Sequence, residues 1–438
     1  MSSEGFKETE IGLIPEDWKI KIAEKFCLRV ADGTHDSPKK KDHGMYLITS
    51  RHLKGNKLDF QNAYLISEQD YDEVNKRSKV NQWDVLISMI GTIGEIYLEN
   101  NKEINYAIKN IGLFKSKNRN QGEWLYYYLK SFRAKEYIHM NKSGTTQEYI
   151  TLGALRKFPI VYPKDDLELK KIISILSSLD RKIELNNKMN QNLEAIGQAI
   201  FRHWFVHFEF PNSEGQPYKS SGGEMVDSEL GEIPKGWDVQ EIGNTIETTG
   251  GGTPSTKKEE YWENGDIQWF SPRDITANKQ MFITDSEKKI TKKGLKNSSA
   301  KLFPPYSLMM TSRATVGELS INTQEASTNQ GFITCIPNEK LSTYYLHFWI
   351  KMNKENIISL SSGSTFREIN KSTFRALKIV IPNNEVLSTY NSLLKSIFSQ
   401  IEILQAQNQE LSQIRASLLP KLMSGKIRVN IPEEATVK

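Results

Sequence analysis

The nine residues Glu10-Ile-Gly-Leu-Ile-Pro-Glu-Asp-Trp18 recur 219 positions later as Glu229-Leu-Gly-Glu-Ile-Pro-Lys-Gly-Trp237, with five of the nine identical. The same offset relates Ser143-Gly-Thr-Thr-Gln-Glu-Tyr-Ile150 to Ser362-Gly-Ser-Thr-Phe-Arg-Glu-Ile369. Twice 219 is 438, the number of residues in the chain. The sequence is therefore one ancestral unit written twice, and any fold assigned to one copy applies to the other.

Each copy begins with a region of mixed character. Short β-branched runs such as Asp84-Val-Leu-Ile-Ser-Met89 and Lys157-Phe-Pro-Ile-Val-Tyr162 predict strands, because Gly, Asn and Pro turns separate them. The aromatic and aliphatic residues of the stretch 123–140 recur with helical spacing and predict helical structure. We therefore expect an α+β globule at the start of each copy.

Each copy ends in a long amphipathic stretch. Apolar residues alternate at spacings of three and four over more than four heptads, which is the a/d pattern of a coiled coil. The first copy supplies Leu169, Ile172, Leu176, Leu179, Ile183, Asn186, Asn190, Leu193, Gly197 and Ile200. The second supplies Leu387, Tyr390, Leu394, Ile397, Ile401, Leu404, Asn408, Leu411, Arg415 and Leu418.

Helices of this length would run for about 50 to 60 Å, too long to bury their apolar stripe against one small globule. The obvious partner of each helix is the other, packed antiparallel so that the two globules are related by a pseudo-twofold axis. Asn190 and Asn408 fall at equivalent a positions, where a buried Asn fixes helix register. The alternative is that one or both lie at the exposed edge of an ordinary helix.

The predicted fold class is thus α+β, with two tandem α+β domains joined by a long antiparallel two-helix coiled coil. A polar linker rich in Gly, Pro and Ser, Phe210 to Gly223, leads into the second copy. The predicted segments are domain 1 (1–165), a central helical spacer (166–208), a linker (209–227), domain 2 (228–383), and a C-terminal helical spacer with its tail (384–438).

Composition narrows the class of protein. Lys and Arg number 58 against 53 Asp and Glu, a net charge of +5 that permits a nucleic-acid partner without demanding one. Two cysteines are too few for a disulfide framework or a Cys-based zinc site. No apolar stretch approaches the roughly 20 residues of a membrane span, and the N-terminus lacks a secretion signal. We expect a cytoplasmic protein without a membrane partner.

Catalytic motifs are scarce. The sequence has no Gly-x-x-x-x-Gly-Lys-Ser/Thr loop, which argues against ATP hydrolysis by a P-loop. Phe303-Pro-Pro-Tyr306 resembles an amino-methyltransferase signature, but Phe303 replaces its polar residue, so a turn before a strand is the favoured interpretation. His203 and His207 have helical metal-ligand spacing without a third ligand, which favours packing. We predict no catalytic residue, metal site or cofactor in this chain.

Loops with hydroxyl residues and lysines recur at matching places in the two copies. Asp32-Gly-Thr-His-Asp-Ser-Pro-Lys-Lys-Lys41 in the first copy corresponds to Gly252-Thr-Pro-Ser-Thr-Lys-Lys258 in the second. Hydroxyls, backbone amides and lysines in a loop suit phosphate oxygens. A solvated basic loop is the alternative, and the recurrence leaves the two interpretations about equally favoured.

Arginines and further loops complete the candidate DNA contacts. Arg51 and Arg273 follow similar short strands, and arginine can bind guanine O6 and N7 in the major groove. The sequence does not separate residues that contact bases from those that contact the backbone. The predicted DNA-binding residues are Thr34, His35, Lys39, Lys40, Lys41, Arg51, Ser143, Thr145, Thr146, Thr253, Ser255, Lys257, Lys258, Arg273, Arg313, Ser364, Thr365 and Arg367.

Taken in order, these features resemble one known family over essentially the whole chain. They are the doubled Glu-x-Gly-x-Ile-Pro-x-x-Trp motif, the Gly33-Thr-His-Asp-Ser-Pro38 loop, Ala314-Thr-Val-Gly-Glu318 with Thr328-Asn-Gln-Gly-Phe332, Ser-Gly-x-Thr before the final strand, and the closing helices. The sequence is similar to the DNA-specificity subunit of type I restriction-modification systems.

The resemblance implies two target-recognition domains, each reading one half of a split, asymmetric site in double-stranded DNA, with helical spacers that set the gap. It also implies two methyltransferase subunits that use S-adenosylmethionine, and restriction subunits that use ATP and Mg²⁺. Two other classes are kept open: a self-sufficient DNA methyltransferase or nuclease with an unrecognised centre, and a coiled-coil adaptor that binds no DNA.

Overall fold

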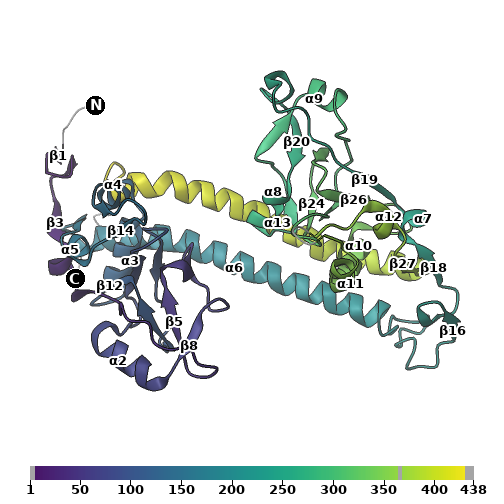
Figure 1. The fold of residues 1–438 in the computed structure, drawn as a ribbon, viewed down its shortest axis with the longest axis horizontal. Helices are drawn as coiled ribbons and strands as arrows, with labels where there is room; N and C mark the ends of the chain where they lie inside the picture. Colours follow the sequence, from purple (N-terminus) through teal and green to yellow (C-terminus); the bar gives the residue numbers. More distant parts are fainter. Residues whose placement is uncertain (1–4, 364–366, 430–438) are drawn as a thin grey trace, which may run out of the picture. The chain divides into compact units, whose positions relative to one another are not determined.

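The computed structural model describes residues 5–363 and 367–429, without the side chain of Asn278. The chain divides into two compact units. Unit 1 comprises the chain up to Ile183 together with the part from Glu410 onward, and unit 2 comprises Glu184–Gln409. The two longest helices are α6 (Asp166–Phe205) and α13 (Asn384–Met423) (Figure 1). One part of each helix belongs to unit 1 and the other part belongs to unit 2. Each unit is therefore an α+β domain together with parts of both long helices.

Unit 1 is built around a four-stranded antiparallel sheet of order β10-β9-β12-β4 and a three-stranded sheet of order β11-β5-β8. The strands of the first sheet are β4 (Arg29–Asp32), β9 (Val85–Ser88), β10 (Ile96–Leu98) and β12 (Ile111–Lys115). Those of the second are β5 (Met45–Thr49), β8 (Tyr64–Ile66) and β11 (Tyr106–Lys109), with β11 parallel to β5. The remaining strands pair as β1 (Phe6–Lys7) with β2 (Ile14–Pro15), β3 (Trp18–Ile22) with β15 (Pro159–Pro163), β6 (Leu53–Lys54) with β7 (Lys57–Leu58), and β13 (Lys142–Ser143) with β14 (Tyr149–Ile150).

The shorter helices of unit 1 are α1 (Ala23–Phe26), 3₁₀ helix η1 (Ser50–His52), α2 (Glu68–Ser78), α3 (Arg119–Leu129), α4 (Phe132–Met140) and α5 (Leu152–Arg156). The two strands predicted around residues 84–89 and 157–162 are confirmed as β9 and β15. The helical structure predicted for 123–140 is confirmed, but it is divided into two helices, α3 and α4. Ser131 breaks the run: its side chain accepts a hydrogen bond from Ala134 N and caps a new helix.

Unit 2 repeats this topology. Its main sheet has the order β19-β26-β23-β24-β21 and its smaller sheet the order β22-β20-β25. The strands are β16 (Met225–Ser228), β17 (Gly231–Pro234), β18 (Asp238–Glu241), β19 (Glu247–Gly250), β20 (Ile267–Phe270), β21 (Phe282–Ile283), β22 (Lys288–Ile290), β23 (Leu308–Thr311), β24 (Leu319–Asn322), β25 (Ala326–Thr328), β26 (Phe332–Ile336) and β27 (Lys378–Ile381). The helices are α7 (Ile242–Thr245), η2 (Glu259–Tyr261), α8 (Pro272–Asn278), α9 (Lys292–Lys296), α10 (Thr343–Met352), α11 (Lys354–Ser359) and α12 (Lys371–Arg375). The first four strands of the main sheet correspond in order to β4, β12, β9 and β10, so the sequence repeat is also a structural repeat.

Buried tryptophans anchor the domain of unit 1 to its first long helix. Trp18 and Trp124 meet edge to face with ring centroids 5.7 Å apart. Trp124 Nε1 donates to the Val161 carbonyl at 3.0 Å, and Trp18 Nε1 donates to Glu168 of α6 at 3.3 Å. Arg428, after the end of α13, donates to the same carboxylate at 2.7 Å. The indole and guanidinium groups thus satisfy a carboxylate whose burial would otherwise be costly.

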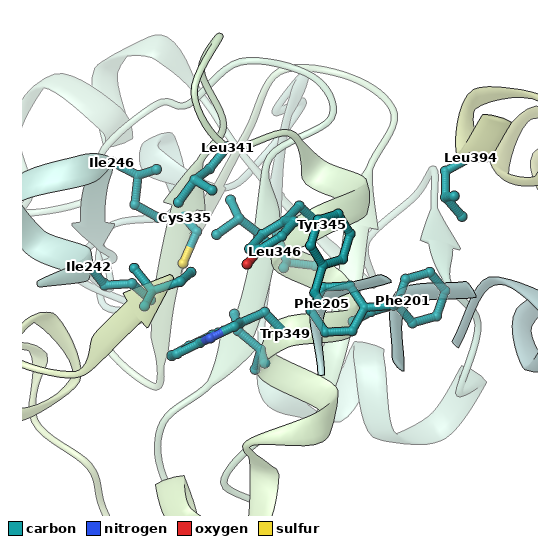
Figure 2. Close-up of a cluster of buried hydrophobic side chains, with 14 of the residues drawn as sticks. Phe201, Phe205, Ile242, Ile246, Cys335, Leu341, Tyr345, Leu346, Trp349 and Leu394 are labelled. Atoms are coloured by element: carbon teal, nitrogen blue, oxygen red, sulfur yellow. The ribbon is translucent and has the colours of Figure 1, made fainter. Parts of the chain in front are cut away.

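In unit 2, an aromatic cluster anchors the domain to α6. Figure 2 shows Phe201 and Phe205 of α6 facing Tyr345 of α10, with ring centroids 5.2 and 4.8 Å from that ring. Phe348, also on α10, lies over Gly197 of α6, where an added Cβ would come within 2.6 Å of its ring. Glycine at this position lets the aromatic ring pack directly on the backbone of the long helix.

The two long helices run antiparallel within each unit. In unit 1, Asp180 of α6 forms an ion pair with Arg415 of α13, whereas Glu168, nearer the start of α6, reaches Arg428 beyond the end of α13. In unit 2, Asn186 pairs with Asn408, and the later Gly197 lies beside the earlier Leu394. The predicted antiparallel packing of the helices is confirmed.

Asn408 is hydrogen-bonded to residues of α6 other than Asn190. Asn186 Nδ2 donates to Asn408 Oδ1 at 3.0 Å, and Asn408 Nδ2 donates to Asn187 Oδ1 at 2.9 Å. Asn190 has no part in this contact, and its Oδ1 is buried without a partner among the described residues. In an antiparallel pair most equivalent positions do not face each other, and here Asn186, one turn before Asn190, lies opposite Asn408.

A half-buried ion pair connects α10 to α6 in unit 2 and predicts a pH effect. Burial raises the pKa of Glu194, but hydrogen bonds from His347 and Lys351 outweigh it and hold the pKa at about 2, below the usual 4.5. Because the folded state binds this proton more weakly, its stabilisation is complete above about pH 4.5 and is lost as the pH falls towards 2. Burial also lowers the pKa of His347, which favours the neutral ring at pH 7.

We therefore expect Glu194→Gln to flatten the loss of stability between about pH 4.5 and 2. Urea unfolding at a series of pH values measures this. Glu247→Gln removes an exposed carboxylate of the same unit and serves as the matched control. We expect this variant to keep the pH dependence of the unmodified chain. An identical slope for Glu194→Gln and the control would show that the carboxylate contributes nothing.

Candidate nucleic-acid interface

Four loops of unit 1, two of which carry predicted DNA-binding residues, are joined by hydrogen bonds. Asn110 is central: its side-chain oxygen lies 2.9 Å from His35 Nδ1, and its carbonyl accepts from Ser50 Oγ at 2.7 Å. The Ser50 hydroxyl oxygen in turn accepts from Met89 N at 3.2 Å. Asn110 has φ of 53°, a left-handed turn that asparagine tolerates and that ends β11.

The same row continues into the β13–β14 hairpin. Ile150 N donates to the Met89 carbonyl at 2.9 Å, and Ile90 forms an isolated antiparallel bridge with Tyr149. We call the residues 34–35, 50–51, 89–91, 110 and 143–149 the first rim. Because its parts are hydrogen-bonded in sequence, the rim offers one continuous row of loops rather than separate flexible segments.

The first rim contains most, but not all, of the residues predicted for the first copy. Thr34, His35, Arg51 and Ser143 lie on it, and Thr145 and Thr146 form its exposed hairpin turn. The lysines of the 39–41 run are exposed, and the backbone N of Lys41 bonds to Leu65 in β8. No hydrogen bond of the described chain joins these lysines to the rim.

Unit 2 has an equivalent second rim, made of residues 253, 271–273, 312–314, 329–331 and 367–369. Hydrogen bonds join four of its five segments: Thr253 Oγ1 donates to Gln330 Oε1 at 2.8 Å, and Ser312 N donates to the Gly331 carbonyl at 2.8 Å. Ala314 N then donates to the Arg367 carbonyl at 2.9 Å. The two copies therefore build the same row of loops from different side chains.

The second rim is the more basic of the two. Arg273 and Arg367 are exposed, and neither guanidinium has a partner in the described chain. Arg313 forms an ion pair with Glu368, with Nε 2.7 Å from Oε1. Exposed guanidinium groups at the end of a strand can contact phosphates or base edges.

The other residues predicted in the second copy have different surroundings. Lys258 Nζ donates to the Tyr261 hydroxyl at 3.0 Å, so this lysine packs against its own loop. The Ser255 carbonyl accepts from Trp262 Nε1 at 3.2 Å, which fixes the loop, and Lys257 is exposed beside it. Ser364 and Thr365 lie outside the described residues.

Sequence analysis missed three elements of the rims. Asn110 and Asn329 recur at the 219-residue offset, a signal that they hold a shared turn, but neither was assigned to a site. Glu368 was missed because its role depends on the strand bridge to Arg313, which the order of residues does not reveal. Tyr149 was missed for the same reason.

Catalytic alternatives find little support among the described residues. No group of three or more His, Cys, Asp or Glu side chains there could hold a metal ion. Phe303 is buried, which fits the predicted turn before β23. Burial raises the pKa of both Cys27 and Cys335 to about 12, so neither thiol is reactive at neutral pH. None of the described helices is apolar over enough length to cross a membrane.

Comparison with known proteins gives a consistent result. The sequence model of the type I restriction modification DNA specificity domain matches residues 15–195 and 234–413, one match in each copy. The MjaIX specificity subunit of Methanocaldococcus jannaschii is 36% identical over 97% of this chain and 96% of its own. The HindI specificity subunit of Haemophilus influenzae is 26% identical over 80% of this chain and 88% of its own.

The fold also has a solved counterpart. The S subunit of a type I restriction-modification system from M. genitalium superposes with a TM-score of 0.56 at 13% identity, and the match covers 95% of this chain and 97% of that one. The doubled sequence match and the shared fold lead to one conclusion. This chain belongs to the family of type I restriction-modification DNA specificity subunits.

Proposed function

We propose that the chain is the DNA-recognition subunit of a type I restriction-modification complex, in which each rim reads one half of a split site in double-stranded DNA. The observation that carries this proposal is the repetition of the rim: two copies of one fold present the same row of loops with different side chains. Because the copies differ, the two half-sites differ and the whole site is non-palindromic, unlike that of a homodimer.

The helix pair supplies the distance between the half-sites. Antiparallel helices with buried apolar seams resist sliding and bending, so they suit a spacer of fixed length. Asp180–Arg415 and Asn186–Asn408 tie the two helices at successive points along that seam. We infer that the helix pair sets the number of base pairs between the two half-sites.

Chemistry would then belong to other subunits. The relatives are named as specificity subunits of type I restriction enzymes. Among the described residues of this chain, no group of His, Cys, Asp or Glu side chains could hold a metal ion. We propose assembly in the cytoplasm with two methyltransferase subunits that use S-adenosylmethionine and with restriction subunits that use ATP and Mg²⁺. A net charge of +5 fits a subunit that shares its contact with DNA among several chains.

Exchange of one domain tests the independence of the two readers. Replacing residues 20–165 by those of another specificity subunit, with co-expression of the cognate methyltransferase, is expected to change one half-site only. Each rim is closed within its own unit, so the second should keep its contacts. Sequencing of methylated adenines gives both half-sites and the gap. A change in both halves would contradict independent reading.

Two assays separate the alternatives. A self-sufficient enzyme would methylate or cleave DNA when the purified chain alone is given S-adenosylmethionine, ATP and Mg²⁺. An adaptor that binds no DNA would not show the steep decrease of affinity with salt that release of counterions from phosphates produces.

A further inference from the structure

One strand bridge on each rim holds a different kind of side-chain pair. In unit 2, Arg313 and Glu368 are directly opposite in an isolated antiparallel bridge and form an ion pair of 2.7 Å. In unit 1, Ile90 and Tyr149 are opposite in an isolated antiparallel bridge. Opposed residues of an antiparallel pair project on the same face, so each bridge presents two neighbouring side chains.

The two bridges are the same position of the repeat. Gly91-Thr-Ile-Gly-Glu95 corresponds to Ala314-Thr-Val-Gly-Glu318, which aligns Ile90 with Arg313. The 219-residue offset of the hairpin aligns Tyr149 with Glu368. The backbone bridge is thus kept in both copies, while its side chains change from an apolar pair to an ion pair.

Ile90 is partly buried against the hydrophobic core of unit 1, but stability of the fold does not explain the other three side chains. The Arg313 and Glu368 side chains are 47% and 40% exposed, and exposed ion pairs contribute little because water and salt screen them. Tyr149 is 42% exposed, although burial is where an aromatic ring stabilises a protein. The backbone bridge is kept in both copies, while its side chains differ and three of the four are exposed beside the other candidate DNA contacts. This combination suits a position that determines specificity.

We propose that this bridge reads one base pair in each half-site: Arg313 with Glu368 reads a G·C pair, and Ile90 with Tyr149 reads an A·T pair through the thymine methyl group. This inference rests on the proposed function and deepens it by naming which residues distinguish bases, and which base pairs they select.

The geometry of the ion pair fits a G·C pair. The carboxylate lies at Nε of Arg313, which leaves the two terminal Nη groups for the O6 and N7 acceptors of guanine. The second oxygen of Glu368 can accept from the N4 amine of the paired cytosine, the group that acidic side chains recognise. The ion pair also holds the guanidinium in place, which reduces the entropy lost on binding.

The geometry of the apolar pair, Ile90 and Tyr149, fits an A·T base pair. Ile90 and Tyr149 offer no charged donor, and Tyr149 lies against Gly144 at the base of the hairpin turn, so its ring has a fixed support. Apolar side chains select thymine by contact with its C5-methyl group. The same strand bridge can therefore serve opposite preferences in the two domains.

Exchange of the pairs tests the inference. The chain is co-expressed with its methyltransferase as wild type, as R313I/E368Y, and as I90R/Y149E, and the methylated sites are mapped by sequencing. R313I/E368Y is expected to lose the preference for one G·C pair in the second half-site by about 5- to 100-fold, which follows from the loss of one bidentate contact. The first half-site and the gap should not change. I90R/Y149E should alter one A·T pair of the first half-site only.

A conservative variant separates base reading from contact with phosphate. R313K keeps the charge but loses the planar fork, so it should reduce the preference for guanine. If Arg313 touched only phosphate, R313K would instead weaken methylation of all sites evenly. Glu224→Gln breaks an exposed ion pair with Lys235 that lies outside the rim, and it is the control with unchanged specificity.

The outcomes are distinguishable. A wild-type chain that directs methylation to no bipartite site overturns the proposed function and this inference with it. A wild-type bipartite site that stays the same in folded R313I/E368Y, as judged by its melting temperature, overturns this inference alone. If R313K weakens methylation of all sites by the same factor, this inference is overturned as well, and the proposed function stands.

Discussion

Replacement of Phe348 by alanine is expected to lower the free energy of unfolding of unit 2 by about 3–5 kcal/mol. Phe348 is fully buried, with its ring against the backbone of Gly197 and 5.8 Å from the ring of Phe398. Truncation would leave a cavity between α10 and both long helices. Because neighbouring aromatic rings are too rigid to fill it, the lost contacts are not replaced.

Hydrogen exchange read by mass spectrometry would localise the effect, since exchange should rise in unit 2 before unit 1. In the methylation assay, recognition of the second half-site should fail at a lower temperature than recognition of the first. Phe132→Ala is the control: this side chain is 66% exposed, so its loss should change stability by less than about 0.5 kcal/mol. Equal loosening of both units would show that they do not unfold separately.

The repeat made much of the fold predictable. Two diverged copies of one unit reveal which positions are needed for the fold, because glycines, turn asparagines and strand patterns recur while other residues change. The strands at 84–89 and 157–162 followed from β-branched runs between turn residues, and the two long helices followed from the three- and four-residue spacing of apolar residues. The break between α3 and α4 did not, because the apolar spacing continues across Ser131 and only the cap at that residue ends the helix.

The candidate site was predictable only as loops. Hydroxyl-rich and basic segments identified Thr34, Thr253 and Arg273, which lie on the rims. They could not show that Lys39–Lys41 extend away towards β8, because that depends on a backbone bond to Leu65. Nor could they pair Arg313 with Glu368, since residues 55 positions apart in the sequence meet only through the strand bridge. Proximity in the folded chain, rather than residue type, separates the rim from other basic loops.

The Asn186–Asn408 contact leads to a prediction about the gap between half-sites. Both residues are buried, at 0% and 6% exposure, and Asn186 Oδ1 has no partner among the described residues. Asn186→Leu or Asn408→Leu alone is expected to cost about 1–3 kcal/mol, because the remaining amide is buried with its hydrogen bond broken. Replacing both by leucine should be nearly neutral or stabilising, since neither amide of the pair is then left buried without its partner. Thermal unfolding of the four proteins in a double-mutant cycle measures the coupling between the two residues.

The functional effect should run opposite to the effect on stability. A polar pair within an apolar seam fixes one register, because any other register would bury each amide against leucine or isoleucine. The Asn186→Leu/Asn408→Leu variant should therefore methylate sites with more than one gap length while both half-sites stay the same. Asn190→Leu is the matched control: its amide oxygen is already unpaired, so this variant should be at least as stable as wild type and should keep a single gap. If the double variant keeps a single gap, the apolar seam alone sets the spacing. If Asn190→Leu broadens it, the register depends on Asn190 after all.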